Sequence, residues 1–393
     1  MHKLDSANRH TLVNWLISGV RDELQIEPIF LQLCDRLVAC GVALSRASLH
    51  LRVHHPQWLG TRVVWVKDHR QADITTIGYD VEATDAFLRS PFRVVIKSGV
   101  EIRQRLQIHG PHQFPVFEEL REEGHTDYLA WPLDHTQGKR HLATFSTSEP
   151  GGFTGEEIAF FREILPLFSL VSEIRLKNQL ALTLLQTYVG PHAGEQILDG
   201  ATTRGSGMSI NAAIMICDLR SFTKLSDRRP RDEVISILNQ YFDAIADPIE
   251  RHGGEILKFM GDGLLAVFPL EQADACTDLL QAVSEAQEAI KGLQGTALGH
   301  EVRYGTGIHL GEVMYGNIGS KKRLDFTVIG PAVNIASRLE ALTKELQRPV
   351  LISADFVRIA GCADRTECLG AYNLRGFEQP VEVHALRLPP IGL

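Results

Sequence analysis

The sequence predicts an N-terminal α/β domain, a connecting helix and a C-terminal α+β domain whose core elements follow the order βαββαβ. Helix and strand patterns alternate before residue 150, and one long helical pattern covers 151–189. After residue 210, apolar strands alternate with amphipathic helices. With 393 residues, 44% of them hydrophobic and 22% charged, the chain is long and apolar enough to bury a core in each domain.

The N-terminal domain is predicted from short patterns of both kinds. Apolar residues at helical spacing predict helices over 21–41 and 114–125. Alternating, β-rich runs predict strands at 47–53, 60–68, 92–99, 126–134 and 141–148.

The connecting helix has a clear start. Thr154 can cap the first turn while Glu157, three residues later, closes a capping box. Pro166 lies inside the helical pattern, so a kink or break is expected there. The stretch 190–210 is rich in Gly, Ser and Thr and is expected to be a linker.

The C-terminal domain has the more regular pattern and is of the ferredoxin-like kind. A hairpin is expected over 255–268, turning at Gly-Asp-Gly, and 219–226 is expected to be a loop. Helices are predicted at 231–252, 271–292 and 331–344. Strands are predicted at 211–218, as a pair within 304–319, at 325–330, and as short strands in the last 45 residues or so.

Composition excludes several classes of protein. A net charge of −8 argues against a nucleic-acid-binding protein, which needs a basic surface. No apolar run is long enough for a membrane span, and the polar N-terminus does not look like a secretory signal. The six cysteines form no C-x-x-C pair, so we expect buried, reduced thiols in a cytoplasmic protein.

Two aspartates are candidates for metal binding. Asp218 ends an apolar strand and Asp262 lies at the tip of the hairpin. Each alone is most simply a cap or a solvated turn residue. If their strands are neighbours, however, both carboxylates reach the same edge of the sheet. Few carboxylates combined with phosphate oxygens suit Mg²⁺, and two such ions can hold the attacking and leaving oxygens of a displacement at phosphorus.

Three further polar residues stand in apolar or helical surroundings. Lys258 lies within the mostly apolar hairpin strand EILKFM, where burial would be costly. Asn334 and Arg338 are four residues apart, so they share one face of a helix. Such a pair is often only a surface feature, but aimed at a phosphate the Arg can stabilise developing charge by bidentate hydrogen bonding.

Four collinear segments make the second domain resemble the catalytic domain of the class III nucleotidyl cyclases, the adenylate and guanylate cyclases. The segments are CDLRSFTKLSD, GGEILKFMGDGLLAVF, GIHLGEVMYGNIGSKKRLDFTVIGPAVNIASRLE and LRGFEQPVEVHAL. Enzymes of this family convert a nucleoside triphosphate into its 3′,5′-cyclic monophosphate and pyrophosphate. The resemblance covers 211–387 and departs at Pro331, where many bacterial relatives have Asp.

The resemblance implies roles for the candidate residues. Asp218 and Asp262 match the two metal-binding aspartates, which implies two Mg²⁺ or Mn²⁺ ions per active site. Asn334 and Arg338 match the pair that contacts the ribose and the transition-state phosphate. In the family these two pairs come from different subunits, so the resemblance implies a head-to-tail homodimer with active sites at its interface.

The same resemblance implies ATP as the substrate. Lys258 matches the base-recognising lysine, where guanylate-forming relatives have Glu, and Thr327 stands at the second base-recognising position. The Lys/Thr combination is similar to the bicarbonate-responsive subgroup, which makes stimulation by bicarbonate a hypothesis. Arg375 falls near a basic triphosphate contact of the family. Guanylate cyclase, or a non-catalytic nucleotide-binding regulator with the same fold, are the alternatives.

The order of elements over 20–175 resembles a GAF domain, a small sensory α/β module, mainly through the strand that leads into GGFTGEEIAFF. The expected organisation is therefore a GAF-like sensory or regulatory domain at 1–175, a connecting helix and linker at 176–210, and a cyclase domain at 211–393. The connecting helix would pass the state of the sensory domain to the dimer interface.

Overall fold

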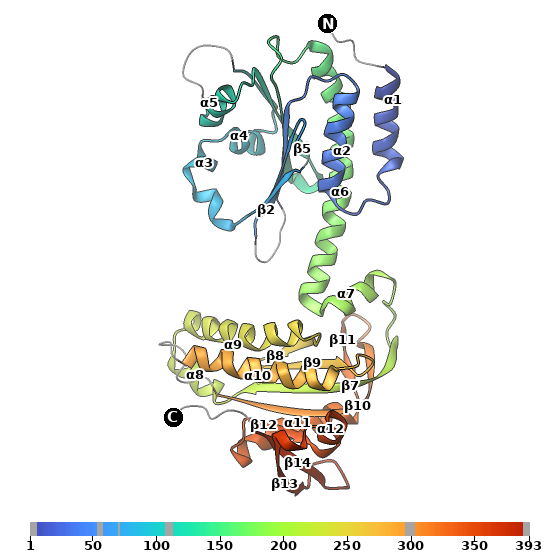
Figure 1. Cartoon of the computed structure of the whole chain (residues 1–393), viewed down its shortest axis with the longest axis vertical. Coiled ribbons are helices and arrows are strands. Elements are labelled where there is room, and N and C mark those ends of the chain that lie inside the picture. Colours follow the sequence, from blue (N-terminus) through green and yellow to red (C-terminus); the bar gives the residue numbers. More distant parts are fainter. Residues whose placement is uncertain (1–5, 53–57, 70, 107–112, 295–302, 388–393) are drawn as a thin grey trace. The chain divides into compact units, whose positions relative to one another are not determined.

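The computed structural model describes residues 6–52, 58–69, 71–106, 113–294 and 303–387. The chain divides into two compact units, Met1–Thr183 and Leu184–Leu393 (Figure 1). The division falls within the long helix α6 (Gly155–Val189), C-terminal to the boundary expected at residue 175.

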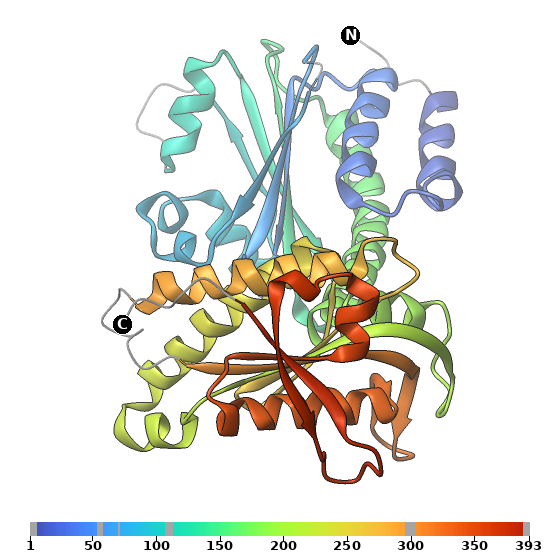
Figure 2. The same cartoon turned by 60° about the horizontal axis from the view of Figure 1, so that its bottom comes forward.

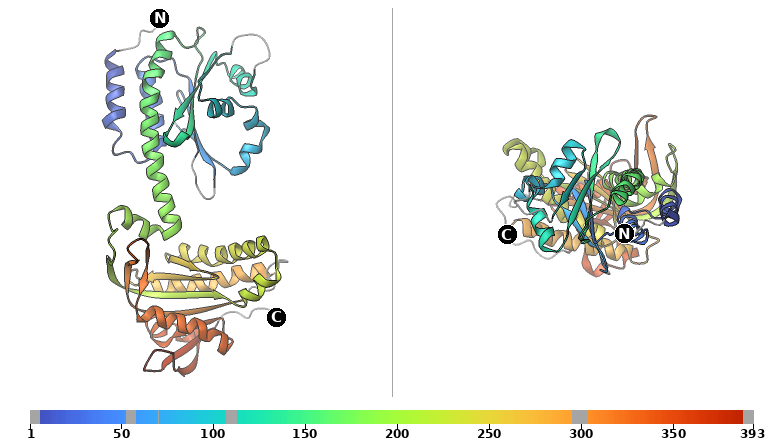
Figure 3. Two further views of the ribbon diagram at one scale, coloured as in Figure 1. Left: turned by 180° about the vertical axis from the view of Figure 1, so that it is seen from behind. Right: turned by 90° about the horizontal axis from the view of Figure 1, so that it is seen from above.

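Among the described residues, the N-terminal unit is a six-stranded antiparallel sheet with helices on both faces (Figures 1 and 3). Its helices besides α6 are α1 (Ser6–Asn14), α2 (Ile26–Ala39), α3 (Asp85–Leu88), α4 (Pro91–Ser98) and α5 (Pro115–Glu122). Its strands are β1 (Arg46–Arg52), β2 (Gly60–Val66), β3 (Asp73–Ile77), β4 (Ile102–Arg105), β5 (Asp127–Asp134) and β6 (Arg140–Thr147). The strand order is β3-β2-β1-β6-β5-β4, with α1, α2 and α6 covering one face and α4 and α5 the other.

The prediction of a strand over 92–99 is wrong, because this segment forms helix α4. The hydroxyl of Ser90 accepts a hydrogen bond from the Arg93 N–H, and Pro91 occupies the first turn, where its missing N–H costs nothing. Gly99, with φ of 70°, ends the helix. The β-branched composition suggested a strand, but Val95 is buried as part of a helical face.

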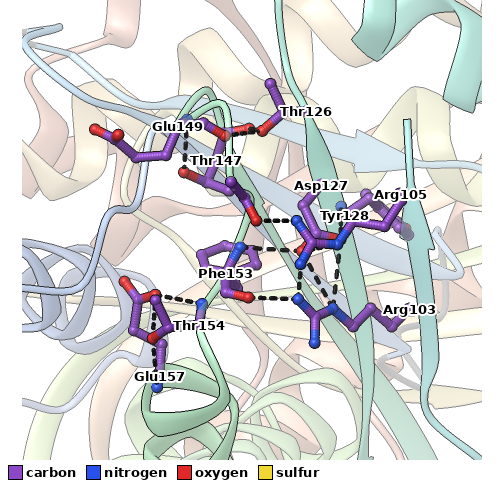
Figure 4. Close-up of polar contacts among 11 residues, drawn as sticks. Arg103, Arg105, Thr126, Asp127, Tyr128, Thr147, Glu149, Phe153, Thr154 and Glu157 are labelled. Carbon is purple, nitrogen blue, oxygen red and sulfur yellow. Dashed lines mark hydrogen bonds and ion pairs between the residues drawn. The ribbon is translucent and has the colours of Figure 1, made fainter. Parts of the chain in front are cut away.

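Helix α6 begins with the predicted capping box (Figure 4). Thr154 N–H donates to Glu157 Oε2 over 2.7 Å, and Glu157 N–H donates to Thr154 Oγ1 over 3.2 Å. The buried carboxylate of Asp127, on β5, accepts from the Phe153 N–H (3.0 Å) and from Arg103 Nη2 (2.7 Å). This carboxylate therefore joins strands β4 and β5 to the start of α6.

The connecting region differs from expectation in two ways: α6 has no break at Pro166, and the expected linker is partly helical. The helix α6 is continuous through Pro166, whose neighbours Ile164, Leu165 and Phe168 are buried in the core and compensate for the lost hydrogen bond. The expected linker contains a helix, α7 (Pro191–Leu198), in which Ala193 is fully buried. Composition alone suggested a loop, whereas packing of this short helix on the C-terminal sheet stabilises it.

The C-terminal unit is an α+β domain that contains one mixed β-sheet (Figure 2). Its further helices are α8 (Phe222–Arg228), α9 (Arg231–Arg251), α10 (Ala275–Gln294), α11 (Pro331–Leu346) and α12 (Ala354–Ala360). Its strands are β7 (Gly207–Leu219), β8 (Glu255–Met260), β9 (Gly263–Pro269), β10 (Tyr304–Gly319), β11 (Leu324–Ile329), β12 (Val350–Ser353), β13 (Thr366–Tyr372) and β14 (Val381–Leu386). The order is β13-β14-β12-β10-β7-β9-β8, with β11 paired to β10.

The central strands β10, β7, β9 and β8 form the expected βαββαβ core, in which each neighbouring pair is antiparallel. Helices α9 and α10 pack on one face, while α7 and α11 pack on the other. The segment expected as a loop after β7 contains α8. The strand pair expected within 304–319 is one long strand, β10, because it pairs with β7 along Tyr304–Gly316.

Two global expectations can be compared with the structure. Among the described residues, no helix has the length and apolar character needed to cross a membrane. All six cysteines are free thiols, and five of them are buried, whereas Cys368 is exposed.

Candidate active site

The carboxylates of Asp218 and Asp262 lie at the same edge of the C-terminal sheet. Asp218, near the end of β7, pairs with Gly263, the first residue of β9. The main-chain N–H of Leu219 donates to the Asp262 carbonyl over 3.3 Å, which holds the hairpin turn beside the end of β7. The condition set by the sequence, that the two strands be neighbours, is met.

Burial and like charge raise the pKa of Asp218 to about 6. Burial is the largest cause, followed by the negative charges of Asp262 and Glu340, whereas Arg220 and the Leu219 N–H act in the opposite direction. Burial also raises the pKa of Glu340, and Asp262 adds to that effect. Three carboxylates thus converge on one place, which is suited to a cation.

The sequence motifs suggested no role for Arg220 or Glu340. Both are half-buried, with Arg220 Nη2 3.3 Å from Glu340 Oε1 and donating to the Glu340 carbonyl over 3.1 Å. Gly305, which pairs with Asp218 from β10, leaves room for the guanidinium, since an added Cβ would come within 3.0 Å of it. In the sequence, only their positions pointed to them. Arg220 stands two positions after Asp218, and Glu340 stands two positions after Arg338.

Lys258 and Thr327 lie on β8 and β11, which are in contact. Thr327 is 8% exposed, and its Oγ1 is buried with no hydrogen-bond partner among the described residues. Lys258 is half-buried and pairs with Leu265, which in turn pairs with Ile216 on β7. Lys258 is two strands away from β7 across the sheet and two residues away from Asp218 along it. The Cα atoms of Lys258 and Asp218 are therefore about 12 Å apart.

Asn334 and Arg338 share the exposed face of α11. The helix buries the opposite side, formed by Ala332, Ala336, Leu339 and Thr343. At 100° per residue, Asn334 and Arg338 each lie about 160° from Ala336 around the helix axis. Within one chain they therefore point away from the sheet that carries Asp218.

Arg375 is exposed in the connection between β13 and β14. It is not among the charges that perturb the pKa of Asp218. One chain therefore brings together Asp218, Asp262, Arg220 and Glu340 at one edge of the sheet. The other sequence candidates lie at separate places on the same unit.

Comparison with known proteins identifies the C-terminal unit. Residues 207–387 match the sequence profile of the adenylate and guanylate cyclase catalytic domain. Adenylate cyclase 1 of Rhizobium meliloti is 34% identical over 178 residues, which cover 43% of this chain and 26% of that protein. The adenylate cyclase of Anabaena cylindrica is 31% identical over 183 residues, covering 46% and 35%.

A solved guanylyl cyclase, Cya2, is 33% identical with a TM-score of 0.41, covering 46% of this chain and 93% of its own. The chain spans 26–37% of the length of the curated relatives that it matches. By sequence, then, residues 207–387 are similar to the catalytic domains of adenylate and guanylate cyclases.

Proposed function

We propose that this protein is an adenylate cyclase, which converts ATP into 3′,5′-cyclic AMP and pyrophosphate. The observation that carries the proposal is the convergence of Asp218 and Asp262 at one sheet edge, inside the segment that matches the cyclase family. In the reaction the ribose 3′-oxygen attacks the α-phosphorus in line, and the bond from phosphorus to the pyrophosphate breaks.

Two Mg²⁺ or Mn²⁺ ions per active site belong to this proposal, and the residues present fit them. Asp218 and Asp262 offer the hard oxygen ligands that these ions prefer. The raised pKa of Asp218 reflects its burial first and then the nearby negative charges of Asp262 and Glu340, which a cation would offset. When bound, the ions supply charge neutralisation of the triphosphate and a lowered pKa of the 3′-hydroxyl. Arg220 would hold Glu340 beside them.

The choice of ATP rests on Lys258 and Thr327, because the matched family includes both adenylate and guanylate cyclases. An ammonium group can only donate, and adenine N1 is an acceptor, whereas guanine N1 carries a hydrogen. The unpaired Oγ1 of Thr327 would find a partner in the exocyclic group of the base. Guanylate cyclase remains the alternative substrate assignment.

The complete active site would form in a head-to-tail homodimer. Asn334 and Arg338 lie on the outer face of α11, away from the Asp218 edge of their own sheet. In the dimer, Arg338 of one subunit would offset the charge that grows on the α-phosphate held by Asp218 and Asp262 of the other. Asn334 would position the ribose, and Arg375 would contact the triphosphate.

The N-terminal unit is proposed as a GAF-like regulatory domain that binds a small-molecule effector. A cavity of about 420 Å³ lies against β1 and β2, and its lining includes Arg46, His50, Arg62 and Phe92. Burial, together with the charges of Arg62 and Arg46, lowers the pKa of His50 to about 3. The histidine is therefore neutral, and the arginines make the cavity suited to an anionic effector.

The test is to incubate purified protein with Mg²⁺ or Mn²⁺ and either ATP or GTP, and to identify the cyclic product by chromatography. Cyclic AMP is the expected product. Cyclic GMP as the main product would support the alternative substrate, and no product from either nucleotide would favour a non-catalytic regulator.

Regulation is tested separately. Removal of residues 1–175 is expected to change the rate of cyclic AMP formation, and an unchanged rate and effector response would contradict the regulatory role. Bicarbonate at constant pH is expected to stimulate the rate, and equal rates with and without it would remove that hypothesis.

A further inference from the structure

Three potential metal ligands gather on the outer face of the β13–β14 hairpin, outside the candidate active site. Cys368 of β13 lies directly opposite His384 of β14, and Glu382 stands two residues before His384 on the same face. A β-bulge at Leu369 follows Cys368 and locally alters the course of this strand. The opposite face, with Val383 and Ala385, is buried in the core.

Two of the distances among these atoms are close to those of a tetrahedral zinc site. Cys368 Sγ lies 3.6 Å from Glu382 Oε1, and His384 Nε2 lies 3.2 Å from the same oxygen. Bond lengths of about 2.3 Å to sulfur and 2.0–2.1 Å to nitrogen or oxygen, at tetrahedral angles, put S and O about 3.6 Å apart and N and O about 3.4 Å apart. All three ligand atoms lie within 4.8 Å of one another.

The imidazole of His384 is oriented from behind by Thr366. Thr366 Oγ1 donates to the Ala363 carbonyl and lies 3.1 Å from His384 Nδ1. Because the hydroxyl has a single hydrogen, it then accepts from Nδ1–H, which leaves the Nε2 lone pair facing Glu382 and Cys368. An ordered partner on the second ring nitrogen is typical of a metal-binding histidine.

We propose that Cys368, Glu382 and His384 bind a zinc-class divalent transition-metal ion, with a fourth position open to water. His384 Nε2 and Glu382 Oε1 are both acceptors and lie 3.2 Å apart, so a cation or a proton must lie between them. The thiol of Cys368 beside them favours a metal ion. Sulfur and imidazole ligands select zinc-class ions over Mg²⁺. The ion would tie the edge strand β13 to β14. This site is independent of cyclase activity.

Cobalt(II) titration of the reduced, metal-free full-length chain tests the proposal. One equivalent of Co²⁺ per chain should produce a near-ultraviolet thiolate-to-cobalt charge-transfer band, and Zn²⁺ should abolish it. The band identifies Cys368, since the other five cysteines are buried and Asp218 and Asp262 supply no thiolate. Thr366→Val should weaken binding about 10- to 100-fold while keeping the band.

Cys368→Ser should remove the band, and His384→Asn or Glu382→Gln should weaken cobalt binding at least about tenfold. Glu367→Gln is the matched control, a carboxylate of the same hairpin that pairs with Arg348 instead, and it should bind like the wild type. Absence of a band, its persistence in Cys368→Ser, or half an ion per chain would each overturn the proposal.

Discussion

The carboxylate of Asp218, at the end of β7, is placed where its charged form destabilises the metal-free protein. Asp218 is partly buried beside Asp262 and Glu340, and its pKa rises to about 6. A raised carboxyl pKa means that the folded state disfavours the charged form, so this group opposes folding at neutral pH. Such a cost is expected where a site is built to receive a cation rather than to stabilise the fold.

The first prediction follows from the raised pKa of Asp218. As pH rises from about 4 through about 6, the folded chain loses stability at Asp218, because the folded state holds its proton more tightly than the unfolded state. Asp218→Asn should therefore raise the melting temperature in metal-free buffer at neutral pH. After discounting for partial exposure, the gain is roughly 1 kcal/mol, or about 2–4 °C.

Calorimetry in the presence of a chelator measures this gain, which should shrink as pH falls towards 4. The same variant should have no cyclase activity. Asp243→Asn, an exposed carboxyl on α9, is the control and should melt like the wild type. An Asp218→Asn protein that melts at or below the wild-type temperature at neutral pH would contradict the electrostatic argument.

The second prediction concerns Lys258. Lys258→Glu replaces a donor with an acceptor, so adenine N1 would face a lone pair instead of an N–H. We expect ATP turnover to fall at least about tenfold, with a smaller loss or a gain for GTP. Rates with each nucleotide measure the ratio, and Lys344→Glu, an exposed charge reversal on α11, is the control. An unchanged ATP-to-GTP ratio would remove the specificity assignment.

At the residue level, the sequence selected two aspartates that the structure brings close together. Asp218 and Asp262 stood out because a carboxylate at the end of an apolar strand needs an explanation. Arg220 and Glu340 did not stand out, because an Arg and a Glu in loop and helix sequences are ordinary surface residues. Their ion pair, and its effect on Asp218, depend on α11 lying over β10.

At the level of elements, that close packing of α11 on β10 positions several candidate residues. Gly307 and Gly305 lie on the β10 face beneath α11, and a Cβ at either would come within 3.0 Å of atoms of α11. The sequence predicted a strand pair within 304–319 and suggested no role for these two glycines. Their actual role is to let a helix approach a continuous strand.

The third prediction tests this packing. Gly307→Ala would push its Cβ into the Ala336 carbonyl and the Glu340 N–H, which are backbone atoms that cannot rotate away. Overpacking of this kind costs about 1–3 kcal/mol, so thermal unfolding should begin earlier. Activity should fall as well, because α11 carries Asn334 and Arg338.

Gly292→Ala, in α10, is the matched control. Nothing lies within 4 Å of its added Cβ, so the change should stabilise the helix by about 0.5–1 kcal/mol. Equal melting temperatures for the two variants would show that α11 is not held closely against β10.

At the level of the whole molecule, one chain separates the parts of the proposed active site. Asp218 and Asp262 lie at a sheet edge, whereas Asn334 and Arg338 point outward from α11. Two copies related by a twofold axis could complete both sites, because the same two surfaces would meet twice.

The fourth prediction uses complementation. Asp218→Asn and Arg338→Ala chains should each be inactive alone. Mixed in equal amounts by co-expression, half of the dimers are heterodimers with one intact site of two, so about a quarter of the wild-type activity should return. Asp218→Asn mixed with Asp262→Asn damages the same half of every site and should stay inactive. Failure of the first mixture to recover activity would argue against a shared site.

The sequence by itself determined the βαββαβ order, the capping box at Thr154 and the candidate residues, because periodicity, caps and rare polar residues in apolar runs are local signals. Tertiary structure decided that α7 is a helix, because short helices depend on packing, whereas α4 also has local signals in Ser90, Pro91 and Gly99. It also decided that β10 is one strand and that Arg220 joins Glu340. The cluster of Cys368 with Glu382 and His384 depends on strand pairing, which brings Cys368 to side chains fourteen and sixteen positions away.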